Sequence, residues 1–423
     1  MSGSAIVAPA TLSTQPRRTA ARRLRICYLV PGHGLLSTAG PSRNVLSLSR
    51  ALASYAEVAI AVRYRLEDRP TTEVEVIELE PERRPRAAID DSATRDMSPL
   101  EFLRYLARLR RFVREAAARF DVFLEKSWIL SGHLSAYGLR LGIPGVPVEN
   151  VVPSAARHRD AGLAKRVRVE AGRRLAGPAL RRVPVVVAET EELKDAIVRV
   201  WGVSPERVAV VPLGVDRGLF RPIAQETARA RLGIPADRFV MLYAGVLDET
   251  HTLDGPIEAL MALRPRGIEL HVLGDGSRRE RYARMAAMTD GAVILHGRVP
   301  HELVPWWIAA ADLCLAPYEP RAFATGDLGY ATMKVPEYLS VGRAVAGSPS
   351  TRMRKLLRDG ALGFLVDFSR ESWLRFLAEP PSREQLAVMG RAALAHPQPS
   401  WDDTARGYLE ACERALAAAE RRM

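Results

Sequence analysis

Short apolar runs alternate with helical patterns along almost the whole chain of 423 residues, and this alternation constrains the fold more than any other feature. The runs in the first half cover residues 24–30, 57–64, 74–79, 121–124, 146–152 and 185–188. A second set begins near residue 238 and covers 239–246, 268–273, 293–295, 313–317 and 344–347. Strands that alternate with helices are typical of parallel α/β sheets. The pattern therefore predicts two doubly wound domains.

A chain of this length exceeds one ordinary hydrophobic core, which supports the division into two domains. We expect a disordered tail over residues 1–22, a first domain over 23–215, a second over 216–395, and a C-terminal helix over 396–423. Doubly wound domains bind ligands at the carboxyl ends of their strands. The cleft between the two domains is therefore the expected active site.

The cysteine content and the absence of long apolar runs indicate a cytoplasmic protein. Cys27, Cys314 and Cys412 lie far apart in the sequence, which is typical of buried thiols in a reducing compartment. No apolar run approaches the roughly 18 residues that a membrane span needs. Near the N-terminus, Arg17 and Arg18 follow the Pro, Ser and Thr residues, an order that is not typical of a secretory signal.

Residues 334–346 combine a helix start with the strand that follows. We expect the helix to open at Glu337 and to end at Gly342, with Lys334 and Glu337 on one face near its N-terminus. A helix N-terminus attracts phosphate, so Lys334 could add a full charge there, while Glu337 could accept hydrogen bonds from ribose hydroxyls. The same spacing is equally typical of a surface Lys–Glu pair that contributes roughly a few tenths of a kcal/mol.

Glycine-rich loops follow several of the expected strands. The first strand leads through Gly32 and Gly34 to Gly40, and another ends at Gly274 and Gly276. Small residues let the backbone approach a phosphate or a sugar at a helix N-terminus, although each loop is also consistent with a plain strand–helix connection. The chain contains no Asp-x-Asp sequence, which disfavours a divalent metal held by carboxylates on a sugar diphosphate.

The net charge of +12 is confined to the first half of the chain. Residues 1–183 hold 31 Lys/Arg against 18 Asp/Glu, whereas residues 184–423 hold 30 against 31. The basic residues concentrate in helical patterns over 102–120 and 157–182, which indicate either solvated helix surface or an anionic partner. Few aromatic residues accompany them, so nucleic acid is not expected. We predict peripheral, salt-sensitive binding of the first domain to an anionic membrane surface, with a soluble acceptor as the alternative.

Eight segments in order along the chain resemble the family 4 glycosyltransferases, which are retaining enzymes with the GT-B fold. The segments are Gly40-Pro41-Ser42, Leu124-Glu125-Lys126, Val148-Glu149-Asn150, Val211-Pro212-Leu213-Gly214-Val215-Asp216, Leu242-Tyr243-Ala244-Gly245, Leu273-Gly274-Asp275-Gly276, Ala311 through Pro317, and Lys334 through Val345. The resemblance implies two Rossmann-like domains facing across a cleft, with a nucleotide sugar bound by the second and the acceptor by the first. It also implies that the final helix, after Trp401, crosses back onto the first domain.

The resemblance also implies roles for individual positions. Glu337 would hold the ribose hydroxyls of the donor, and Lys334 would face its diphosphate. The remaining residues expected at the donor site are Gly40, Gly245, Gly274, Asp275, Gly276 and Gly329. Those expected on the acceptor side are His33, Glu125, Glu149 and Asn150. The implied catalytic residues are Lys334, Asn150 and Glu125.

Three positions depart from the fullest family pattern. Val246 stands where an arginine is common, His251 where a lysine is common, and Gly329 where the first glutamate of a Glu-x7-Glu pair would fall. Some members with Ser-Pro-x-Lys before the second glutamate also lack these groups, and here that segment reads Ala-Thr-Met-Lys. We expect His251 to be a loop-surface residue. The departures leave the phosphate contacts and the sugar selectivity open.

The implied reaction is a metal-independent, retaining transfer of a sugar from a nucleoside diphosphate to a hydroxyl. The acceptor would be a glycan, a lipid-linked precursor or a natural product, and no cofactor beyond the donor is expected. Helix N-termini and Lys334 can stabilise the negative charge that develops on the leaving diphosphate. The three departures also fit a catalytically weak relative that binds a nucleotide sugar or supports a partner enzyme.

Overall fold

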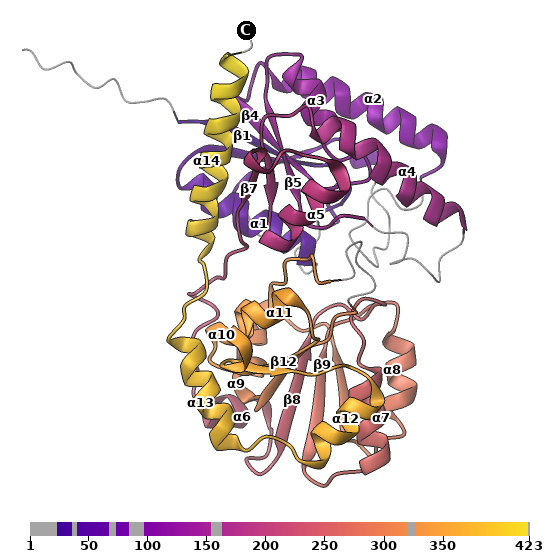
Figure 1. The fold of residues 1–423 in the computed structure, drawn as a ribbon, viewed down its shortest axis with the longest axis vertical. Coiled ribbons are helices and arrows are strands. Elements are labelled where there is room, and N and C mark those ends of the chain that lie inside the picture. The colour runs from indigo at the N-terminus through magenta and orange to yellow at the C-terminus, as the bar shows by residue number, and fades with distance from the viewer. Residues whose placement is uncertain are drawn as a thin grey trace, which may run out of the picture.

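The computed structural model describes residues 23–35, 40–66, 73–83, 97–153, 163–319 and 327–421. The predicted tail, residues 1–22, lies outside the described residues. Two domains, each built around a parallel sheet, are arranged one after the other along the longest axis (Figure 1). This arrangement confirms the predicted two-domain, doubly wound α/β fold.

Among the described residues, the sheet of the first domain has seven parallel strands in the order β3-β2-β1-β4-β5-β6-β7. The strands are β1 (Arg25–Val30), β2 (Glu57–Val62), β3 (Glu75–Glu78), β4 (Val122–Lys126), β5 (Gly145–Glu149), β6 (Val186–Ala188) and β7 (Val208–Val210). The helices are α1 (Gly40–Ala53), α2 (Pro99–Ala116), α3 (His133–Leu139), α4 (Leu163–Leu180) and α5 (Glu191–Trp201). Strand order reverses between β1 and β4, and such a switch point is where doubly wound sheets bind ligands.

The second domain repeats the plan with a described sheet of six parallel strands in the order β10-β9-β8-β11-β12-β13. The strands are β8 (Phe239–Ala244), β9 (Ile268–Leu273), β10 (Val293–Gly297), β11 (Leu313–Ala316), β12 (Ala344–Gly347) and β13 (Gly363–Leu365). The helices are α6 (Gln225–Leu232), α7 (Asp254–Leu263), α8 (Arg279–Ala286), α9 (Val304–Ala310), α10 (Lys334–Ser340), α11 (Thr351–Leu356), α12 (Arg370–Ala378) and α13 (Arg383–Leu394). Strands covered by helices on both faces need continuous apolar sequence, as in β11, where all four residues are buried.

The last helix, α14 (Trp401–Glu420), returns to the first domain and lies beside it in Figure 1. Ser400 caps its N-terminus in a capping box with Asp403. Trp401, Tyr408 and Cys412 are buried in the hydrophobic cluster that also contains β1 and α1 residues. The predicted crossing helix is therefore confirmed, and its apolar face completes the core of the first domain.

Helix α10 begins at Lys334, three residues before the predicted start at Glu337. Pro336 fits this earlier start, because the first-turn N–H groups of a helix lack intrahelical partners and proline has none to lose. The preceding segment is held by a 2.5 Å hydrogen bond that the Tyr318 hydroxyl makes with the Thr332 hydroxyl. Beyond the helix end, Gly342 has a φ of +83°, which agrees with the predicted stop.

The cysteine expectation agrees with the structure, since Cys27, Cys314 and Cys412 are all buried and free. Within the described residues, no helix has the length and apolar character needed to cross a membrane.

Candidate active site

The start of α10 lies at the boundary between the two domains. Ala331 and Met333, just before the helix, pack into the hydrophobic cluster of the first domain. In the opposite direction, Val151 of the first domain packs against the main cluster of the second. These reciprocal contacts place Lys334 and Glu337, in the first turn of α10, where the two domains meet.

Lys334 is held between two tyrosine rings of the second domain. Its Nζ donates a 3.3 Å hydrogen bond to the Tyr243 hydroxyl, and it lies 4.5 Å from the Tyr243 ring centroid and 5.1 Å from that of Tyr318. Burial lowers the pKa of Lys334 to about 7, against the raising effect of the Asp248 and Glu337 charges. The sequence did not predict either tyrosine, because an aromatic residue in or after a buried strand is ordinarily core.

Two of the predicted donor-site glycines, one beside this lysine and one beside the first glycine, allow close packing at the site. A Cβ atom on Gly245 would lie 2.9 Å from Lys334 Nζ, so a larger residue there would displace the ammonium. Gly274 has a φ of +129°, and a Cβ atom there would lie 1.8 Å from the carbonyl oxygen of Gly245. The two loops can therefore pack together only with glycine at position 274.

The other residues of the glycine loop after β9 are tied to neighbouring groups. Asp275 accepts a 2.8 Å hydrogen bond from the Gly276 N–H and lies 3.4 Å from an Arg279 guanidinium nitrogen. Gly276 has a φ of +158° and packs against the Leu247 backbone. Asp275 thus fixes the loop and pairs with the helix that follows it.

Glu337 is a buried carboxylate, 7% exposed, one helical turn from Lys334. No group among the described residues donates a hydrogen bond to its side chain, and it forms no ion pair with Lys334. Burial raises the pKa of Glu337 to about 7, while the charges of Arg43 and Lys334 lower it. The alternative of an exposed surface Lys–Glu pair is therefore wrong for this segment.

The three positions that depart from the family pattern have different surroundings. Val246 is 47% exposed, and Gly329 is buried ahead of α10. The expectation that His251 is a loop-surface residue is wrong, since its side chain is 12% exposed. Its Nδ1 lies 2.8 Å from an Asp248 carboxylate oxygen, and its ring centroid lies 5.1 Å from that of Tyr318. His251 therefore belongs to the aromatic group around Lys334.

On the acceptor side, Glu125 is enclosed at the end of β4. One oxygen accepts a 2.8 Å hydrogen bond from Trp128 Nε1, and the other accepts bonds of 2.8 and 2.6 Å from the Ser135 N–H and hydroxyl. The residue is 0% exposed. Both carboxylate oxygens thus hold β4 to the segment around α3, and the geometry gives Glu125 a structural role.

Glu149, at the end of neighbouring β5, is also 0% exposed but only partly satisfied. One oxygen accepts a 2.5 Å hydrogen bond from the Ser131 hydroxyl, while the other has no partner among the described residues. Burial raises the pKa of Glu149 to about 8, and the Glu125 charge adds to that effect. Glu149 is therefore largely protonated at neutral pH.

The remaining predicted residues of the first domain lie nearby in the fold. His33 follows β1 and Asn150 follows β5, and both are partly buried, while Gly40 is the first residue of α1. The structure brings the donor residues together at α10 and the acceptor glutamates together at β4 and β5. No hydrogen bond or ion pair joins Glu125 or Glu149 to Lys334 or Glu337.

Charged contacts join the two domains across their boundary. Glu192, in the first turn of α5, lies 3.3 Å from Arg352 and 2.7 Å from Lys355 of α11. Arg43 of α1 contacts His301, which begins η4 (His301–Leu303) in the second domain. Sequence reasoning missed these pairs because the partners are separated by more than 150 residues. The one sequence signal was Arg43, a cation in the first turn of a helix, where positive charge is unfavourable.

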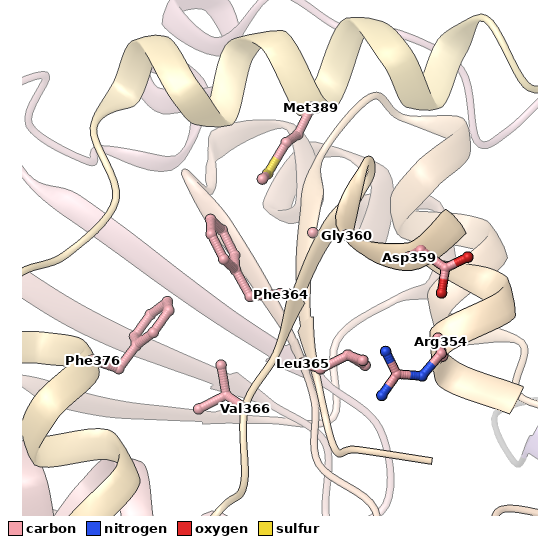
Figure 2. A pocket seen from close by; sticks show the side chains of 9 residues that line it. Arg354, Asp359, Gly360, Phe364, Leu365, Val366, Phe376 and Met389 are labelled. Carbon is pink, nitrogen blue, oxygen red and sulfur yellow. The ribbon is translucent and has the colours of Figure 1, made fainter. Parts of the chain in front are cut away.

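A pocket of about 410 Å³ lies elsewhere in the second domain, beside β13 (Figure 2). Its walls include the side chains of Phe364, Phe376 and Met389, which point toward its interior in the figure. None of the predicted site residues lines it. This pocket is therefore separate from the candidate active site.

Two family models match the chain on either side of the domain boundary. The model described as Glycosyltransferase Family 4 matches residues 38–219, and the one described as Glycosyl transferases group 1 matches residues 238–375. The chain is a glycosyltransferase, with a Family 4 domain followed by a group 1 domain. The enzyme class that the resemblance implied is thus confirmed.

Curated relatives agree with this assignment over most of the glycosyltransferase. A D-inositol 3-phosphate glycosyltransferase from Xylanimonas cellulosilytica is 29% identical over 408 residues, which cover 90% of this chain and 92% of the relative. Another protein of the same name, from a Nocardioides species, is 29% identical over 337 residues, covering 73% and 70% of the two chains.

Solved structures show the same fold at low sequence identity. HepE from Anabaena, determined with UDP-glucose, has a TM-score of 0.69 at 15% identity and covers 92% of this glycosyltransferase and 99% of its own chain. Sucrose-phosphate synthase from Thermosynechococcus elongatus has a TM-score of 0.66 at 18% identity, with coverage of 94% and 100%. Both support the predicted GT-B architecture.

Proposed function

We propose that this glycosyltransferase moves a sugar from a nucleoside diphosphate to a hydroxyl acceptor, with retention of configuration and without a metal ion. The observation that carries the proposal is the Glu337 carboxylate, which is buried and receives no hydrogen bond from the described residues. Buried polar groups nearly always have hydrogen-bond partners. A ligand with neighbouring hydroxyls, such as a ribose, would supply them.

Lys334 supports the diphosphate half of the proposed donor. It is the first residue of α10, next to the glycine loops at positions 245 and 274, and its ammonium can approach a phosphate there. A positive charge at that place would stabilise the leaving diphosphate as its bond to the sugar breaks. Because a departing phosphate oxygen can take the acceptor proton, the proposed reaction needs no protein base, and Glu125 and Glu149 keep their buried positions.

The names of similar proteins support both substrate classes. HepE was determined with UDP-glucose, which makes uridine nucleotides the first donors to test. The curated relatives are named for D-inositol 3-phosphate, so a phosphorylated polyol is the first acceptor to test. Glycans, lipid-linked precursors and natural products remain within the proposed acceptor class, a hydroxyl compound bound by the first domain.

Helix α2 supports the proposed peripheral binding to anionic membranes. Leu100 and Leu103 in its first turns are 57% and 61% exposed, and Arg104 and Arg111 are exposed. Further along the helix, Leu109 is buried in the core, and Leu106 and Phe112 pack against it. The apolar side chains of α2 that are available to insert into a membrane therefore lie only at the start of the helix. The other predicted segment, residues 157–182, is only partly within the described residues.

A thermal-shift screen tests the donor proposal. Ligands that bind only the folded state raise its apparent stability, so at least one nucleotide sugar in a panel of uridine, guanosine, adenosine and thymidine donors should raise the unfolding temperature. Slow hydrolysis of that donor, or faster consumption with a phosphorylated polyol, would then support transfer. A panel in which no nucleotide sugar shifts the transition contradicts the proposal.

A further inference from the structure

Arg43 occupies an electrostatically unfavourable position in the first domain. It lies in the first turn of α1, a 14-residue helix with no acidic residue in that turn. A helix N-terminus carries partial positive charge, so a cation there is destabilised unless an anion is close. The N–H groups of the same turn also face outward without intrahelical partners. This end of α1 therefore gathers positive charge at the domain boundary.

Within the described residues, the contact that the Arg43 guanidinium makes with a side chain of the second domain compensates that charge only weakly. Its NH1 group contacts Nδ1 of His301 in the second domain. Burial and the Arg43 charge lower the pKa of His301 to about 3, so the histidine is neutral: its ring can accept a hydrogen bond from Arg43 but supplies no negative charge. The Arg43 Nε is buried and has no partner among the described residues. The guanidinium thus has hydrogen-bonding capacity left for an anion.

Arg43 also lies near the proposed donor site, because α1 packs into the same hydrophobic cluster as Ala331, just before α10. Among the charges that lower the pKa of Glu337, that of Arg43 is the largest, ahead of Lys334 on the same helix. A cation of the first domain therefore lies close to the carboxylate proposed for the ribose. In the second domain, Val246 carries no charge and His251 is held by Asp248, so Lys334 would face a diphosphate with little help from these positions.

We propose that Arg43 is a donor-binding residue supplied by the first domain, whose guanidinium contacts the diphosphate of the nucleotide sugar. This inference rests on the proposed function. A guanidinium can bind phosphate oxygens through two parallel hydrogen bonds, which a lysine cannot reproduce. The diphosphate would also compensate the positive end of α1. Donor binding would then join α1 of the first domain to α10 of the second.

The test compares the dissociation constants of UDP and uridine by calorimetry in the full-length protein. Four variants are compared with the wild type: Arg43→Gln, Arg43→Lys, His301→Ala and Arg50→Gln. Arg50 is an exposed arginine on the same helix, so its replacement is a control for the loss of one charge. Unfolding temperatures of all variants check that each is folded.

If Arg43 binds the diphosphate, Arg43→Gln should weaken UDP binding by about 10- to 100-fold, the range for hydrogen bonds to charged groups, while uridine binding changes less than about twofold. Arg43→Lys should fall between Arg43→Gln and the wild type. His301→Ala should leave UDP binding unchanged or tighten it, because it frees the guanidinium. Arg50→Gln should match the wild type.

If Arg43 only holds the two domains together, the variants should show a different pattern of UDP and uridine binding. Arg43→Gln and His301→Ala would then weaken UDP and uridine binding equally, or would change neither. Either result, with UDP still bound by the wild type, overturns the inference and leaves the proposed donor class intact. A wild-type protein that binds no nucleoside diphosphate overturns both.

Discussion

The Lys334 ammonium lies 4.5 Å from the centroid of the Tyr243 ring and 3.3 Å from the hydroxyl of the same residue. Contact with a ring face stabilises the charged form of a lysine, whereas burial destabilises it. Burial is the larger effect and lowers the pKa of Lys334 to about 7, although the Asp248 and Glu337 charges act to raise it. Its charge is therefore poised to respond to an anionic ligand near neutral pH.

The first prediction is proton uptake on donor binding. At pH 8 the free Lys334 is mostly neutral, since its pKa is about 7. A bound diphosphate favours the ammonium and raises that pKa, so binding should take up a substantial fraction of about one proton. Calorimetric titration of UDP in buffers of different ionisation enthalpy measures this uptake. The Lys334→Met variant should show much less, and equal uptake in both proteins would assign the proton to another group.

The second prediction separates catalysis from packing at Lys334. If its charge stabilises the leaving diphosphate, Lys334→Met should lower kcat at saturating donor as well as affinity, by on the order of 100-fold for loss of one such group. A lysine that only fills the space between Tyr243 and Tyr318 would instead lower the unfolding temperature and leave kcat unchanged. Steady-state kinetics and thermal unfolding of the same preparation distinguish these outcomes.

The third prediction concerns the pH dependence of stability that results from burial of Glu149. Folding raises the pKa of Glu149 from 4.5 to about 8. Proton binding by Glu149 therefore stabilises the folded protein fully below pH 4.5, and this stabilisation is lost as the pH rises through 8. Glu149→Gln keeps an acceptor for Ser131 and removes the titration. The free energy of unfolding of Glu149→Gln minus that of the wild type should therefore be larger at pH 8.5 than at pH 5, by on the order of 2 kcal/mol.

Denaturant unfolding at several pH values measures that difference. Replacement of exposed Glu115 of α2 by Gln is the control for the removal of one carboxylate from the first domain. A Glu149→Gln difference that does not change with pH would show that the Glu149 carboxylate titrates normally in the folded protein.

The fourth prediction concerns membrane binding through α2. Wild-type protein should sediment with vesicles that contain anionic phospholipid at low salt and should be released at high salt. Replacing both Leu100 and Leu103 with Ser should reduce the bound fraction several-fold, because each is more than half exposed. Val388→Ser, at an exposed apolar position on α13, should have no effect. Wild-type protein that stays in the supernatant at low salt would favour a soluble acceptor.

Local sequence patterns predicted most of the fold because the buried strands are continuous apolar runs. Run 268–273 coincides with β9, and run 24–30 differs from β1 by one residue. The strand β13 was not predicted, since three residues beginning with glycine carry too little apolar pattern. The start of α10 was also predicted at the wrong residue. Proline is favourable at several positions around a helix N-terminus, so Pro336 did not fix where the helix begins.

The candidate site was predictable only where one segment holds several of its groups. Lys334 and Glu337 share a helix turn, so their spacing indicated a common face. Tyr243 lies 91 residues from Lys334, and Arg43 lies 258 residues from His301, so these contacts depend on the tertiary arrangement. Glu125 was predicted as a site residue, but the sequence did not reveal that Trp128 and Ser135 enclose its carboxylate.

The affinity of Glu337→Ala for the donor nucleotide tests the central claim most directly. If the buried carboxylate accepts ribose hydroxyls, calorimetry with UDP, or the nucleotide preferred in the donor screen, should show affinity reduced by roughly 1.5–3 kcal/mol relative to the wild type. Glu384→Ala, at an exposed position on α13, is the matched control and should bind like the wild type. A folded Glu337→Ala variant with wild-type nucleotide affinity would contradict the account.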